Sequence, residues 1–234
     1  MTAPLGYFRA VRAVCTKHSA LLILDEIICG MGRVGAPHAW QLEGPGVQPD
    51  LQTVAKGVCG GYASVSMLLM NQKVVDGLKY FAHGHTFSSH AVACAAAVAV
   101  QKVVARDGLV SNAAVMGVRL GEGLRGAIGN HPHVGDVRGR GLLWAIEFVE
   151  NKKTKKPFDP SRGIAGKIRE IGMQEPWKIS LYPGTGTADG VNGDHVMIAP
   201  PFTITEDEVD LIVRLVAGVV EAALGPYTGA TASL

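Results

Sequence analysis

Four consecutive aliphatic residues at 21–24 end in an acidic pair, Asp25 and Glu26. A continuous apolar run of this length is typical of a strand buried on both faces of a parallel sheet. Directly before it, residues 7–18 carry apolar side chains at three- and four-residue spacing, which predicts an amphipathic helix. A helix followed by a buried strand favours an α/β fold. Asp25 would then lie at the carboxyl end of its strand, where open α/β sheets bind ligands.

The same alternation continues beyond the acidic pair. Residues 51–54 and 65–70 are predicted strands bounded by glycine and proline. Residues 88–105 predict a long helix that is small and apolar on nearly every face, which suits deep packing. A second helix is predicted over 109–128.

The pattern changes after about residue 110. Residues 137–149 predict a strand and hairpin, 161–173 a short helix, 182–194 a long loop and 196–199 a strand. The last helix begins at a capping box formed by Thr205 and Glu208. We therefore predict two domains: an α/β part over 1–110 and a small α+β domain over 111–234.

Charge and hydropathy exclude several classes of protein. The net charge is only +2 and the Lys-rich stretch at 152–156 is short, which argues against nucleic acid or an anionic membrane as the main partner. The longest apolar run, 91–100, falls well short of the roughly 20 residues that span a membrane. The four cysteines lie far apart without a CxxC pair, which favours a reduced intracellular compartment, cytoplasmic or mitochondrial, over a disulfide framework.

A lysine stands at the end of the second predicted strand. Lys56 lies between Val54-Ala55 and Gly57-Val58, and apolar surroundings lower the pKa of a lysine and make its amine nucleophilic. Asp25 and Lys56 are expected at one sheet edge. That pair suits pyridoxal phosphate, which needs a lysine for its aldehyde and an acid beside its ring nitrogen. We assign no metal ligands.

Another function is compatible with the acidic pair alone. An aliphatic strand ending in Asp25-Glu26 also looks like the Walker B strand of an ATPase. No GxxxxGK[ST] phosphate loop occurs in the sequence, however. The ATPase hypothesis therefore requires a phosphate loop upstream of residue 1.

Four blocks carry a more specific resemblance: LLILDEIICGMGRVG, PDLQTVAKGVCGGY, GHTFSSHAVACAAAVAV and GDHVMIAPPFTITEDEVD. In this order and spacing, from about Gly6 to Leu224, the chain resembles the carboxyl-terminal half of the class III (ω-type) pyridoxal-phosphate aminotransferases. The resemblance implies part of a fold-type I large domain, with a mostly parallel sheet truncated on its N-terminal side, followed by the small domain. It also implies a homodimer.

The resemblance assigns roles to four positions. Asp25 would pair with the pyridine nitrogen, and Lys56 would bind the cofactor covalently and then act as general base and acid. Thr86 matches the position that reaches the cofactor phosphate across the dimer interface; from the residues alone, it could instead cap the helix that begins near Ser88. Ile28 replaces a glutamine that some members place against the phenolic oxygen, and an aliphatic residue there resembles the branch acting on ω-amines and ω-amino acids.

The substrate is constrained by a departure from the family pattern. Members that recognise an α-carboxylate often carry an arginine shortly before the Ala-Pro-Pro segment, and the matching positions here are Gly190 and Met197. We therefore expect transfer between an amine or ω-amino acid and a 2-oxo acid such as pyruvate. Arg138 and Arg140 could meet a substrate carboxylate, although a structural role is the simpler interpretation.

The length is a second departure. Family members run to more than 400 residues, against 234 here, and the resemblance places the phosphate-binding cup and the aromatic residue that stacks on the cofactor in the half that precedes this sequence. The strand at 21–24 would then be an unpaired edge. We expect the chain alone to be inactive. The alternative is a non-catalytic remnant that binds full-length aminotransferase subunits.

Overall fold

The computed structural model describes residues 3–80 and 83–226, and the chain forms two compact units. The first comprises residues 3–113, and the second begins at Ala114, inside the helix α4 (Leu109–Ile128).

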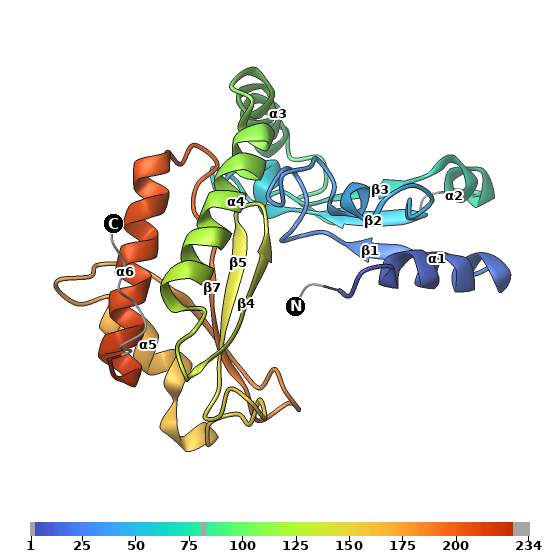
Figure 1. Ribbon diagram of the computed structural model, residues 1–234. Coiled ribbons are helices and arrows are strands. Elements are labelled where there is room, and N and C mark those ends of the chain that lie inside the picture. The colour runs from blue at the N-terminus through green and yellow to red at the C-terminus, as the bar shows by residue number, and fades with distance from the viewer. Residues whose placement is uncertain (1–2, 81–82, 227–234) are drawn as a thin grey trace. The chain divides into compact units, whose positions relative to one another are not determined.

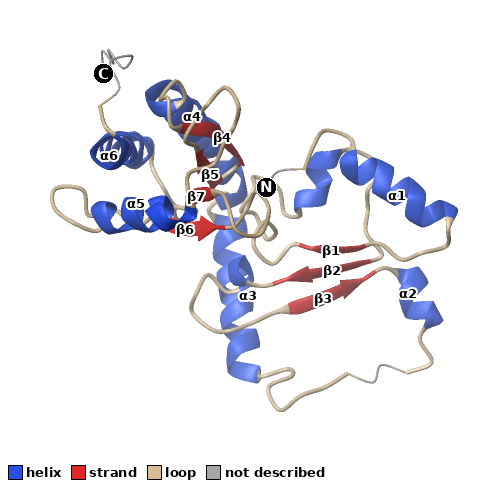
Figure 2. Ribbon diagram, turned by 90° about the horizontal axis from the view of Figure 1, so that it is seen from below, coloured by secondary structure: helices blue, strands red, loops and turns tan. Residues whose placement is uncertain are grey.

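The first unit is built on a three-stranded sheet in the order β1 (Ile23–Asp25), β2 (Leu51–Val54), β3 (Met67–Met70). The first two strands are parallel and β3 is antiparallel to β2. The unit also contains the helices α1 (Tyr7–Lys17), α2 (Gln72–Gly77) and α3 (Ala91–Arg106), and the short 3-10 helices η1 (Ala39–Glu43) and η2 (Lys56–Val58). Figure 2 shows the arrowhead of β2 directed toward α3.

The predicted burial of the first strand on both faces is wrong for this chain. Leu22 and Leu24 are buried, whereas Ile23 is 60% exposed. β1 is an edge strand of its sheet, and α1 contains no buried residue. One face of this part of the sheet therefore carries exposed aliphatic side chains.

The third helix also differs from its prediction. It begins at Ala91 rather than Ser88, and only Ala97 and Val104 are buried. Val92 and Val98 are exposed by 73% and 54%. The apolar composition that predicted deep packing instead leaves exposed small and branched side chains on most of the helix.

A buried carboxylate ties together the amino ends of the parallel strands. Asp50 Oδ2 accepts hydrogen bonds from the Leu22 N–H at 2.8 Å and from Arg12 at 2.6 Å, and Oδ1 accepts from Asn71 at 2.9 Å. These three donors precede β1, lie on α1 and cap α2, respectively. Asp50 therefore fixes the register of β1 against β2 at the edge opposite Asp25.

The second unit has a four-stranded antiparallel sheet in the order β4-β5-β7-β6. Its strands are β4 (Val134–Arg140), β5 (Leu143–Phe148), β6 (Tyr182–Thr185) and β7 (Asp194–Ile198). The helices α4, α5 (Ile164–Gly172) and α6 (Glu206–Leu224), together with the 3-10 helix η3 (Pro160–Arg162), complete the unit. Figure 2 shows the three α-helices on one face of the sheet. Figure 1 shows the order of these elements along the chain by colour.

The sequence missed β6, because 182–194 was predicted to be a loop. Tyr182–Thr185 pairs with β7, and Gly184 lies opposite His195. A Cβ at Gly184 would overlap the imidazole of His195, so this register needs a glycine. By contrast, the predicted capping box is confirmed, with Thr205 and Glu208 satisfying the first turn of α6.

None of the helices in the described parts of the chain is both long enough and apolar enough to cross a membrane.

Candidate cofactor site

Two parallel strands bring Asp25 and Lys56 to the same sheet edge. Asp25 lies opposite Thr53 in the register of β1 and β2, and the Glu26 N–H donates to the Thr53 carbonyl oxygen at 2.9 Å. Lys56 follows three residues after Thr53, and neighbouring strands lie about 4.8 Å apart. Asp25 and Lys56 are both exposed. A carboxylate and a primary amine are therefore presented together at the carboxyl edge of the sheet.

Lys56 adopts a strained backbone conformation. Its φ is +40°, in the left-handed region that favours glycine, and it begins the 3-10 turn η2. The next residue, Gly57, packs so closely that a Cβ there would lie 3.1 Å from the Cβ of Met31. Strain of this kind persists only where the surrounding structure imposes it, and it clusters at functional sites.

The loop after Asp25 presents a carboxylate and an apolar side chain. Asp25 Oδ1 accepts a hydrogen bond from the Ile27 N–H at 3.0 Å, which orients the carboxylate. Ile28 follows in the same loop with 47% of its surface exposed. Burial, and next the charge of Glu26, raises the pKa of Cys29 to about 11, so this thiol is protonated at neutral pH.

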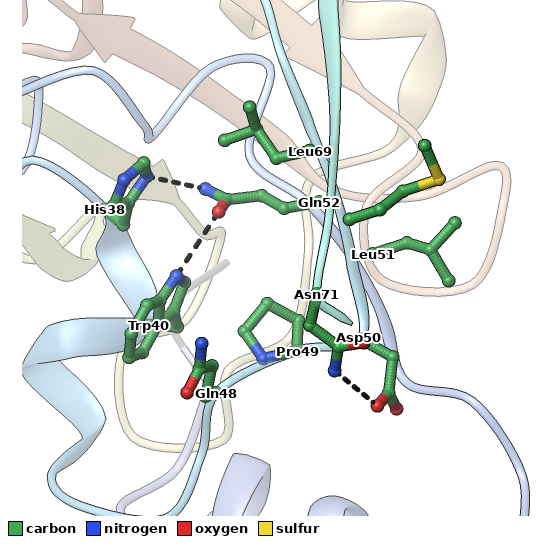
Figure 3. A pocket seen from close by; sticks show the side chains of 10 residues that line it. His38, Trp40, Gln48, Pro49, Asp50, Leu51, Gln52, Leu69 and Asn71 are labelled. Atoms are coloured by element: carbon green, nitrogen blue, oxygen red, sulfur yellow. Dashed lines mark hydrogen bonds between the residues drawn. The ribbon is translucent and has the colours of Figure 1, made fainter. Parts of the chain in front are cut away.

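Glu26 has a different role from its neighbour. The residue is 3% exposed, and its carboxylate accepts hydrogen bonds from the N–H groups of Ala39 at 2.7 Å and Trp40 at 2.8 Å, and from Gln52 Nε2 at 2.8 Å. Gln52 also contacts His38 and Trp40 (Figure 3). Glu26 thus anchors the start of the loop that carries Ile28. Both of its oxygens accept hydrogen bonds, so neither is free to activate water in the way that a Walker B glutamate does. Sequence reasoning missed this network because its partners are distant in the chain.

A cleft beside this network lies at the other end of β2. Its lining includes Trp40, Pro49, Leu69 and Asn71 (Figure 3). These residues surround the start of β2 and the end of β3, whereas Lys56 follows the end of β2. The cleft is therefore separate from the edge that carries the amine.

Thr86 is not brought to this edge within the chain. It is exposed in a turn that precedes α3, whereas Gln101 of that helix contacts the Lys56 segment. Ala91 and Gln101 are separated by about 15 Å along the helix axis. The idea that Thr86 caps this helix is wrong, because His90 is the N-cap and accepts from the Ala93 N–H at 3.2 Å.

Comparison with known proteins decides the family. The family model for "Aminotransferase class-III" matches residues 1–220 of the chain. The chain belongs to the class III aminotransferases. This class III chain is 48% identical over 227 residues to an aminotransferase from Gibberella zeae, covering 95% of the chain and 44% of that relative. It is 34% identical to the taurine–pyruvate aminotransferase of Bilophila wadsworthia, covering 95% and 48%.

The fold agrees with solved transaminases. An (S)-enantioselective omega-transaminase from Thermomicrobium roseum superposes on the class III chain with a TM-score of 0.83 at 32% identity. That match covers 95% of this chain and 48% of the solved one. The chain therefore spans about half the length of the relatives it matches, and it carries the α/β architecture of part of a transaminase.

The residues at the strand ends fit the cofactor that the family implies. Pyridoxal phosphate requires a primary amine and an acid for its ring nitrogen. In this class III chain an amine and an acid, Lys56 and Asp25, are both exposed at the carboxyl ends of adjacent strands, and the apolar Ile28 lies in the loop after Asp25.

The arginines considered for a substrate carboxylate belong to the second unit. Arg138 Nη1 contacts Glu147 at 2.5 Å and Asp136 at 3.0 Å, so its charge is engaged in ion pairs on the sheet. Gly190 lies in the turn between β6 and β7 with φ +95°, and Met197 is half-buried in β7.

Proposed function

We propose that this chain contributes the cofactor-binding lysine and acid of a pyridoxal-phosphate-dependent transaminase. The reaction would transfer an amino group between an amine or ω-amino acid and a 2-oxo acid such as pyruvate. The observation that carries the proposal is the placement of exposed Lys56 and Asp25 at the ends of adjacent parallel strands. The strained φ of Lys56 adds support.

Each residue has a definite task in this proposal. Pyridoxal phosphate supplies an electron sink for the substrate carbon when it is bound. Lys56 holds the cofactor through its Nζ and, once freed by the substrate amine, carries a proton as general base and acid. Asp25 keeps the ring nitrogen protonated through its charge. Ile28 offers the ring an apolar contact.

Thr86 is proposed to serve a second subunit. It lies in the turn before the first residue of α3, and Ala91 is about 15 Å along the helix axis from Gln101, which contacts the Lys56 turn; this supports a role away from the site of its own chain. We propose that Thr86 binds the cofactor phosphate of the partner in a homodimer. The four cysteines are free, which suits the intracellular compartment proposed for the enzyme.

The proposed substrate class, an amine or ω-amino acid, rests on the presence of Gly190 and Met197 at the positions where an arginine would bind an α-carboxylate. Neither residue can pair with an α-carboxylate in the bidentate manner of arginine, and Arg138 is occupied by Glu147 and Asp136. The relative from Bilophila wadsworthia is named for taurine and pyruvate. An ω-amine donor and pyruvate as acceptor are therefore the pair to test first.

We further propose that these 234 residues do not complete the reaction by themselves. They cover less than half of each curated relative compared above, and apolar side chains such as Ile23 and Val92 are exposed on the first unit. Surfaces of this kind mark contacts with further polypeptide. The same observation favours a second candidate, a non-catalytic chain that binds full-length aminotransferase subunits.

A chimera separates these functions. The matching 44% of the Gibberella zeae aminotransferase would be replaced by this chain, and alanine formation from pyruvate would be measured with taurine and β-alanine as donors. We expect turnover by the chimera, none by the 234-residue chain alone, and none by the chimera with Lys56→Ala. A folded chimera without turnover, together with capture of the native relative by the isolated chain, would favour the binding function instead.

A further inference from the structure

The turn that carries Lys56 is held by a side chain 45 positions later in the sequence. Gln101, on α3, donates from Nε2 to the Val58 carbonyl oxygen at 2.8 Å and to the Gly57 carbonyl oxygen at 3.0 Å. One amide group thus satisfies two successive carbonyls of the segment that begins with Lys56. Gln101 is half-buried between the helix and the turn.

The other contacts of the turn are apolar and less directional. Val58 and Cys59 are 1% exposed and pack in one cluster with Val54 and Ala97. On another side, Gly57 packs against Met31 of the loop that follows Asp25. Apolar packing holds the turn near α3 without fixing the orientation of its peptide groups, since the hydrophobic effect is non-directional. Hydrogen bonds have strict angular requirements, so the Gln101 amide can fix the orientation of these peptide groups.

The strain at Lys56 needs such a restraint. With φ at +40°, Lys56 is held in a region that non-glycine residues avoid, and the peptide groups of the next two residues are the ones that Gln101 binds. The N–H groups of Cys59 and Gly60 donate back to the Lys56 carbonyl oxygen at 3.3 and 3.1 Å. Loss of the Gln101 contacts would let this turn relax toward ordinary backbone angles.

We infer that Gln101 is a positioning residue for Lys56: it holds the strained turn so that the amine stays at the sheet edge beside Asp25. This inference rests on the proposed function, because it assigns Gln101 a role in presenting the amine to the cofactor. Gln101 acts through the backbone of the turn and through no contact with the cofactor itself.

The first measurement is amide hydrogen exchange in the full chain without cofactor. Gln101→Leu keeps the volume and removes the donor, and Lys102→Ala on the neighbouring exposed position is the matched control. We expect the Cys59 and Gly60 amides to exchange about 30-fold faster in Q101L, because the turn loses both hydrogen bonds from the Gln101 amide. The Glu26 amide, which donates to Thr53, should exchange as before in both variants.

The second measurement is the rate at which pyridoxal phosphate forms a borohydride-stable adduct on Lys56, followed by peptide mass spectrometry. We expect this rate to fall at least about 5-fold in Q101L, to be unchanged in K102A and to recover in part in Q101N, whose shorter amide can still donate. Unchanged exchange at Cys59 and Gly60 would overturn the inference. Faster exchange with an unchanged adduct rate would overturn it too, because Gln101 would then only stabilise the turn.

Failure of the proposed function is distinguishable from failure of this inference. If Lys56 forms no adduct in the wild-type chain or in the chimera, the proposed function fails, and the positioning role fails with it. If the wild-type adduct forms and Q101L behaves like wild type, only the role of Gln101 is overturned.

Discussion

Asp25 lies directly opposite Thr53 in the parallel register of β1 and β2, and Lys56 follows Thr53 by three residues, just beyond the end of β2. This relationship converts two residues 31 positions apart in the sequence into neighbours at one sheet edge. The register is fixed at both ends, by Asp50 at the amino ends of the strands and by the Glu26 N–H at their carboxyl ends.

Asp25→Asn should weaken cofactor binding without destabilising the chain. The asparagine Oδ1 can still accept from the Ile27 N–H, so the free energy of unfolding should change by less than about 0.5 kcal/mol. Loss of the charge that would hold the ring nitrogen protonated should raise the half-saturating pyridoxal phosphate concentration for adduct formation at least about 10-fold. An unchanged half-saturating concentration would show that Asp25 does not face the ring nitrogen.

Glu26→Gln should destabilise the first unit. The amide nitrogen would replace an oxygen that accepts from Ala39, Trp40 or Gln52, leaving a buried donor without an acceptor at a cost of about 1–3 kcal/mol. Urea unfolding would measure the loss, with exposed Asp76→Asn as the control. Equal midpoints for the two variants would mean that the Glu26 network does not stabilise the loop.

The low pKa of Asp50 predicts how the free energy of unfolding depends on pH. Burial by itself would raise the pKa of this carboxyl, but hydrogen bonds from Arg12, the Leu22 N–H and Asn71 outweigh burial and hold the pKa at about 2. Because the folded pKa lies below the unfolded value of about 3.9, the resulting stability is complete above that value and is lost as pH falls toward 2.

The corresponding variant is Asp50→Asn. It should cost about 3 kcal/mol at pH 7, because Arg12 loses the partner of a largely buried ion pair. It should also flatten the decline in unfolding free energy between pH 4 and 2, measured by urea titration at several pH values. A decline as steep as that of the wild type would assign the acid sensitivity to other carboxyl groups.

Alanine substitutions at two glycines of α4 should change the stability of the chain in opposite directions. A Cβ at Gly117 would overlap the carbonyl group of Gly141, so Gly117→Ala should destabilise the second unit by about 2 kcal/mol. Nothing lies within 4 Å of a Cβ at Gly126, and Gly126→Ala should stabilise by about 0.5–1 kcal/mol. Thermal unfolding of both variants tests this pair, and a shift of the same sign in both would contradict the packing described for α4.

The sequence predicted best those elements whose pattern is local. The bounds of β2 and α4 agree with the predicted ranges, and the capping box of α6 lies where Thr205 and Glu208 indicated. β6 was missed because Pro183 and Gly184 are poor strand residues; the strand forms through pairing with β7 and the close approach of His195 to Gly184.

The site was predictable only in part for a similar reason. Asp25 and Lys56 each follow a recognisable strand, so their shared edge could be expected from sequence. Glu26 and Gln101 act through partners up to 44 positions away, and no local pattern marks such contacts. The burial of β1 and α3 was overestimated because apolar composition does not reveal whether this chain supplies the surface that covers them.

Mapping of the reduced cofactor adduct tests whether Lys56 is the residue that binds the cofactor. The 234-residue chain would be incubated with pyridoxal phosphate, reduced with borohydride and mapped by peptide mass spectrometry. We predict an adduct concentrated on Lys56, lost in Lys56→Arg and diminished when taurine or β-alanine is added before reduction. An adduct spread over exposed lysines such as Lys102, without preference for Lys56, would contradict the claim.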